Sequence, residues 1–124
     1  MAQRVRPALR LVLAAGFMVA GMLHFYKQQA YVRIVPPQLA NHALVLVQLS
    51  GACELLGGLG ILMVKARKTA GYGLLALLVA VFPANIYMAV HPQAFKDMAA
   101  PAALWLRLPL QFVFMAWVWW CCLA

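Results

Sequence analysis

Four long apolar runs constrain the fold of this chain more than any other feature. They lie at about residues 8–26, 43–64, 69–90 and 102–123. Each is close to the ~20 residues that an α-helix needs to cross ~30 Å of hydrocarbon. Because 67% of the 124 residues are hydrophobic, a water-soluble domain of this size could not cover them. The sequence therefore predicts an all-α integral membrane four-helix bundle, a single transmembrane domain over residues 1–124 embedded in the lipid bilayer.

The first run has a second interpretation, a cleaved signal peptide. Arg4, Arg6 and Arg10 lie at its start. Small residues such as Ala20 and Gly21 lie near its end, as they do before a cleavage site. We expect an uncleaved first helix instead, because the run leads through "HFY" into a structured loop.

Basic residues are unevenly distributed along the chain, whose net charge is +8. The N-terminal segment and the turn between the second and third runs carry six of them: Arg4, Arg6, Arg10, Lys65, Arg67 and Lys68. The other two connections carry three, Lys27, Arg33 and Lys96, with Asp97 offsetting the last. The positive-inside rule predicts that both termini are cytoplasmic. A charge sorted by leaflet does not indicate a nucleic-acid partner, and we expect none.

The two outer connections are expected to be ordered. Residues 27–43 contain apolar residues before the pair Pro36 and Pro37, and residues 91–101 mix proline, phenylalanine and methionine with polar residues. We expect the two segments to form a lid over the bundle. Each of the two segments joins two consecutive spans, which suggests that the chain folds as two helical hairpins that lie parallel to each other.

Five polar residues lie within or near the ends of the predicted spans, where ionisable groups are costly and usually face the bundle interior. Counting 1.5 Å per residue from the outer ends, Glu54 and Gln111 are roughly 15 Å deep. Arg107 and Asn85 are roughly 8 Å deep, and His24 is shallower. All five belong to the outer half or the midplane.

Arg107 is expected to pair with Glu54, because each is the sole charge of its sign well inside a span. Arg107 shares a helix face with Gln111 at a spacing of four residues. If the second and fourth helices are not adjacent, Arg107 would instead extend to the outer surface. Asn85, close after Pro83, is open to two roles, binding a neighbouring helix or a ligand. His24 is likewise open to proton exchange or interfacial anchoring.

Motifs of common cofactor sites are absent. The histidines form no pair at a spacing of four residues, so neither a metal site nor haem is predicted. There is no C-x-x-C motif for dithiol exchange. Gly57, Gly58 and Gly60 are expected to serve helix packing. Trp117, Trp119 and Trp120 are expected in an aromatic belt at the inner interface.

The segments "GMLHFYKQQAYVRIVPPQL", "LSGACELLGGLGIL", "VFPANIYMA" and "WLRLPLQ" together resemble the DoxX-like family of small bacterial four-helix membrane proteins. The resemblance covers all four spans. It implies a bacterial inner-membrane location and a polar inner cluster formed by His24, Glu54, Asn85, Arg107 and Gln111. The family takes its name from a subunit of a thiosulfate:quinone oxidoreductase, while many similar members have no assigned reaction.

Three functions follow as hypotheses. The first is a redox-associated accessory subunit that binds a small lipophilic molecule such as a quinone, in which Arg107 and Gln111 donate to a carbonyl and Glu54 or His24 exchanges a proton. Its partners would be subunits of a membrane redox complex, with no covalently bound cofactor. The alternative is a non-catalytic structural or assembly subunit. A membrane enzyme would require Glu54 to titrate near neutral pH, so catalysis is left open, as is the oligomeric state.

Overall fold

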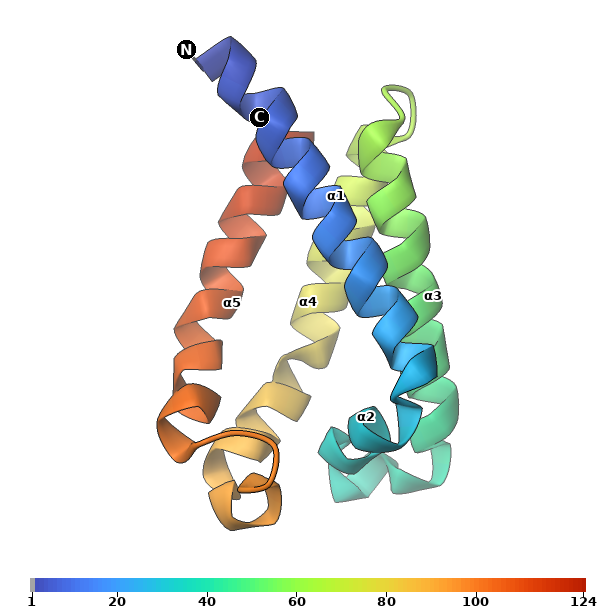
Figure 1. Cartoon of the computed structure of the whole chain (residues 1–124). Helices are drawn as coiled ribbons and strands as arrows, with labels where there is room; N and C mark the ends of the chain where they lie inside the picture. Colours follow the sequence, from blue (N-terminus) through green and yellow to red (C-terminus); the bar gives the residue numbers. More distant parts are fainter. Residues whose placement is uncertain (1) are drawn as a thin grey trace.

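The computed structural model describes residues 2–124, with side chains from residue 5 onward, and every regular element in that range is helical (Figure 1). Four helices are long: α1 (Ala2–Tyr26), α3 (Ala43–Leu62), α4 (Arg67–Val90) and α5 (Pro101–Cys122). Three elements are short: α2 (Gln28–Ile34), η1 (Pro37–His42) and η2 (Pro92–Phe95).

The four long helices are long and apolar enough to cross a membrane, which confirms the predicted fold class and indicates a membrane protein. Their bounds follow the four apolar runs to within a few residues, except at the N-terminus. There α1 begins at Ala2, so Arg6 and Arg10 belong to the helix and do not precede it.

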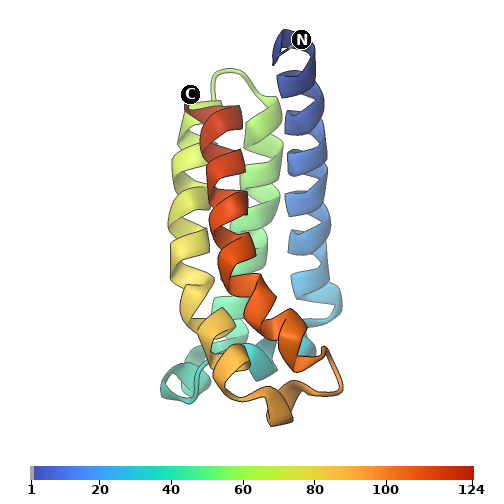
Figure 2. The ribbon, with the colours of Figure 1, turned by 90° about the vertical axis from the view of Figure 1, so that its left-hand side faces the viewer.

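The chain forms the two predicted hairpins. Helix α1 packs against α3, and α4 packs against α5, while α3 and α4 join the hairpins along a third contact. Both termini lie at one end of the bundle with the α3–α4 turn, here the terminal end (Figures 1 and 2). The short elements α2, η1 and η2 lie at the other end, here the lid end. Helices α1 and α5 approach each other near the terminal end and separate toward the lid end (Figure 1).

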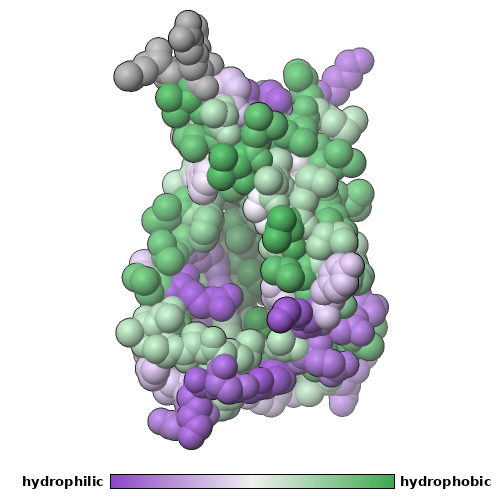
Figure 3. Space-filling view, in the orientation of Figure 1, coloured by the Kyte–Doolittle hydropathy of each residue, from purple (hydrophilic) through white to green (hydrophobic). Residues whose placement is uncertain are grey.

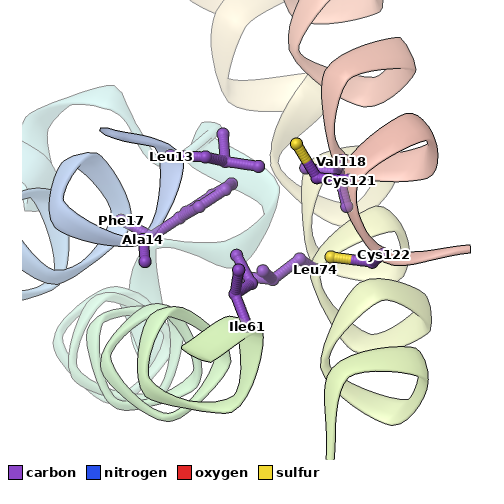
Figure 4. Packing of buried hydrophobic residues seen from close by; sticks show 8 residues of the cluster. All are labelled: Leu13, Ala14, Phe17, Ile61, Leu74, Val118, Cys121 and Cys122. Atoms are coloured by element: carbon purple, nitrogen blue, oxygen red, sulfur yellow. The ribbon is translucent and has the colours of Figure 1, made fainter. Parts of the chain in front are cut away.

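The apolar core lies at the terminal end, where all four long helices contribute side chains (Figure 4). Its buried members are Leu13, Ala14, Phe17, Ile61, Leu74, Val118, Cys121 and Cys122. Two arginines bond to carbonyl groups at helix C-termini beside this core. Arg10 Nε donates to the Cys121 carbonyl at 2.7 Å, and Arg67 Nε donates to the Ile61 carbonyl at 2.8 Å. Cations are favourable there because the free carbonyl groups carry partial negative charge.

Small residues let α1 and α3 approach closely. A Cβ atom added to Gly51 would lie 2.7 Å from the Cβ atom of His24 and 3.1 Å from the Gly21 carbonyl oxygen. A Cβ atom on Gly58 would lie 2.9 Å from the Ala14 carbonyl oxygen. Gly57 and Gly60 meet α4 side chains equally closely, so the predicted packing role of these glycines is confirmed.

The lid end is held by a contact between the two hairpins. Both terminal nitrogens of Arg33, on α2, donate to the Asp97 carboxylate beyond η2, at 2.9 and 3.0 Å. Phe95 lies beneath this pair, 2% exposed, against Met88 and Leu104. Hydrogen bonding to Arg33 lowers the pKa of Asp97, and the same bond raises the pKa of Arg33. The two connections therefore form an ordered lid, as predicted.

Candidate functional site

A cavity of about 700 Å³ lies between the two hairpins, toward the lid end. Figure 3 shows the hollowed face, with hydrophobic residues above and around it and hydrophilic residues gathered near the lid. All four long helices and α2 contribute to its walls, which are mainly apolar. The polar residues predicted to form an inner cluster all line it: His24, Glu54, Asn85, Arg107 and Gln111. A volume between ~300 and ~1,000 Å³ with a few polar groups is typical of sites for small molecules.

Glu54 contacts His24. Its Oε2 atom lies 3.1 Å from His24 Nδ1, which also lies 2.7 Å from the Ala20 carbonyl oxygen. Both neighbours of Nδ1 are acceptors, so this nitrogen carries the hydrogen and donates it to Ala20. Glu54 Oε2 is thereby left buried and without a hydrogen bond from any residue in the described range. This oxygen needs a donor or a proton.

The predicted ion pair between Arg107 and Glu54 is wrong. Helix α3, which carries Glu54, packs against α1 and α4, whereas Arg107 is on α5. The two charges therefore face the same cavity from elements that do not pack on each other. Within residues 2–124 the Arg107 side chain, which is exposed at the cavity wall, has no ion-pair or hydrogen-bond partner.

The two amides of the cluster bond to each other. Asn85 Nδ2 donates to Gln111 Oε1 at 2.7 Å, and Gln111 Nε2 donates to the Leu78 carbonyl at 2.7 Å. Gln111 is 5% exposed, so this short chain of hydrogen bonds joins α4 to α5 inside the bundle. Each amide retains at least one hydrogen or lone pair for a ligand.

Tyr31 was not predicted as a site residue, because the sequence placed it in a connection. Its ring stacks on His24, with ring centroids 4.0 Å apart and ring planes 21° apart, and it lines the cavity from α2. Burial raises the pKa of Tyr31, the Glu54 charge raises it further, and the Arg107 charge lowers it. The phenol therefore lies within the fields of both cavity charges. The sequence offered one signal for this role of Tyr31: it is an aromatic residue, five positions after Tyr26, in a connection that was expected to be ordered.

Trp117 was expected in an aromatic belt but lines the cavity from α5, together with Ser50 from α3. Trp119, at 54% exposed, keeps the orientation expected of a belt residue. In the part of the chain that the structure describes, no three histidine, cysteine or acidic side chains are grouped closely enough to hold a metal ion. The site is thus a mainly apolar chamber with separate donors and acceptors.

Comparison with known proteins identifies a family. No curated protein and no solved structure matches the chain. The family model described as "Domain of unknown function (DUF8561)" matches residues 13–122, which include the cavity lining apart from Val12 and all four long helices except the first turns of α1. The chain therefore belongs to the DUF8561 family.

Proposed function

We propose that this protein binds a small lipophilic molecule in its intramembrane cavity and acts as an accessory subunit of a membrane redox complex in the bacterial inner membrane. The observation that supports binding most directly is the cavity of about 700 Å³, in which five polar side chains from four helices meet apolar walls. The assignment to a redox complex and to the bacterial inner membrane comes from the resemblance to DoxX-like proteins.

A quinone is the first candidate ligand. One of its carbonyl oxygens could accept hydrogen bonds from Gln111, whose second amide hydrogen is free, and from Arg107. Its reduced form would carry a hydroxyl group, which could donate to the unbonded Oε2 atom of Glu54. His24, at 3.1 Å from that atom, could exchange a proton with it.

The test is to purify the protein in a mild detergent and to identify co-purified small molecules by mass spectrometry. Gly16→Phe fills the cavity, because Gly16 lines it and no heavy atom lies within 4 Å of an added Cβ. Gly73→Phe is the matched control, since Gly73 is equally unobstructed but lies outside the cavity. We expect the wild type and Gly73→Phe to carry the same molecule and Gly16→Phe to lose it. Retention in Gly16→Phe, or no bound molecule in the wild type, would contradict the proposal.

A structural or assembly subunit is the second candidate, and the polar contacts favour it. His24 with Glu54 joins α1 to α3, and Asn85 with Gln111 joins α4 to α5, so the cluster could serve only to fix the helices. Glu54→Gln separates the two functions. A purely structural role predicts lower recovery of the folded protein or of its complex, whereas a binding role predicts normal recovery with altered ligand retention.

A further inference from the structure

The cavity contains a cation that the protein does not neutralise. Arg107 lines the cavity, and no side chain or carbonyl group in residues 2–124 pairs with it. Glu54, the one acidic side chain in a span, lies beside His24 instead. A cation in the hydrocarbon region is unfavourable unless a counter-charge or water satisfies it. The most direct source of a counter-charge is a ligand.

Arg107 is also placed where a headgroup would be. It lies six residues after Pro101, the first residue of α5, and therefore about 9 Å along the helix from its lid end. Helices α1 and α5 separate toward the lid end (Figure 1), and the face of the molecule between the two hairpins is hollowed (Figure 3). Tyr31 lines the same cavity from α2 at the lid end and can donate from its hydroxyl group. Deeper in, the lining includes Phe17 and Phe114, which offer only apolar contacts.

We propose that the ligand is an acidic amphiphile, whose carboxylate or phosphate headgroup pairs with Arg107 and whose acyl chain lies along the apolar walls. The inference rests on the proposed function: it keeps the lipophilic ligand and the cavity, and it replaces the neutral quinone by an acidic molecule. A guanidinium matches the two oxygens of a carboxylate or phosphate in a bidentate pair. A neutral ligand of the same size would leave the charge of Arg107 uncompensated. The separation of α1 from α5 lets such a molecule enter sideways from the bilayer.

The experiment measures quenching of Trp117 by brominated probes in nanodiscs of phosphatidylcholine. Trp105, Trp119 and Trp120, which do not line the cavity, are replaced by phenylalanine so that Trp117 alone reports. The probes are a brominated C18 fatty acid in its ionised form, the matching fatty alcohol and a brominated phosphatidylglycerol. A short-chain quinone is tested by competition with the fatty acid and the alcohol.

We expect the acid to bind at least about tenfold more tightly than the alcohol, since hydrogen bonds between charged groups are stronger than those to a neutral hydroxyl. Arg107→Gln should remove this advantage, so that the acid and the alcohol bind this variant with similar affinity. Arg107→Lys, which retains the charge but not the bidentate geometry, should keep part of it. Lys96→Gln is the matched control, because it removes an exposed cation at the same end of the bundle that does not line the cavity.

Equal affinity for acid and alcohol in the wild type would overturn the inference, and this comparison needs no variant. Equal behaviour of Arg107→Gln and Lys96→Gln would also overturn it. If the alcohol or the quinone binds as well as the acid, the cavity is still a lipophilic site and only the acidic class is refuted. If no probe binds, the proposed function itself fails. If the inference holds, the two acidic probes identify the source of the headgroup. Quenching by phosphatidylglycerol would identify the ligand as a membrane phospholipid, and quenching by the fatty acid alone would identify it as a free acid.

Discussion

Gly51→Ala should loosen the contact that brings His24 to Glu54. The new Cβ atom would lie 2.7 Å from His24 Cβ, whereas ordinary contact begins at 3.4 Å, so α1 must move by about 0.7 Å. Neither His24 Cβ nor the Gly21 carbonyl oxygen at 3.1 Å can rotate away, because both are fixed to the helix backbone. Overpacking of this kind costs ~1–3 kcal/mol, while alanine recovers up to ~1 kcal/mol of helix propensity.

Gly73→Ala isolates the steric cost. Gly73 is inside α4 with no heavy atom within 4 Å of an added Cβ, so this variant gains helix propensity alone. In detergent titrations with sodium dodecyl sulfate followed by circular dichroism, we expect Gly51→Ala to be ~1–3 kcal/mol less stable than Gly73→Ala. Gly51→Ala should also retain less of the ligand found in the wild type. Equal stability of the two variants would show that α1 moves freely on α3. It would refute the argument that the close contact between these helices holds His24 beside Glu54.

Two further predictions concern the hydrogen bonds at the cavity and the lid. Gln111→Leu leaves the Asn85 amide and the Leu78 carbonyl without their side-chain partner. It should therefore lower the free energy of unfolding by ~1–3 kcal/mol in the same titration. A smaller loss than that of an exposed control such as Leu106→Ala would contradict this. Because Arg33 lowers the pKa of Asp97, the lid contact is stabilising above the unfolded pKa of ~3.9 and is lost as the pH falls below it. Hydrogen exchange of residues 28–34, relative to intrinsic rates, should stay constant from pH 7 to about pH 4 and then accelerate, whereas Asp97→Asn should remove this pH dependence.

The fold was predictable because hydrocarbon thickness limits what each apolar run can do. Four runs of about 20 residues have few arrangements other than four crossing helices, and the structure places them within a few residues of the predicted bounds. The lid was predictable in outline, since proline and apolar residues in a connection indicate order. The α2 helix and its contact through Arg33 were not, because a seven-residue helix depends on tertiary contacts that local sequence does not specify.

The members of the polar cluster were predictable, but their partners were not. The depth of each residue along its helix follows from residue counting. Glu54, Arg107 and Gln111 were therefore expected in the outer half or at the midplane, and they line one cavity. Pairing also requires knowing which helices are neighbours. Gly21 and Gly51 let α1 pack closely against α3. This close approach places Glu54 beside His24 and leaves Arg107 on the other side of the cavity.

The apolar core and the candidate cavity therefore lie toward different ends of the bundle. At the terminal end, the apolar core and the bond from Arg10 to the Cys121 carbonyl hold α1 and α5 together. Toward the lid end the same helices separate, and the side chains of Glu54 and Arg107 line one cavity without pairing with each other. An ion pair between them would have closed this space and satisfied both groups. Because they are held apart, the proposed ligand would have access to both groups, and the contacts at the terminal end would keep the bundle assembled during binding.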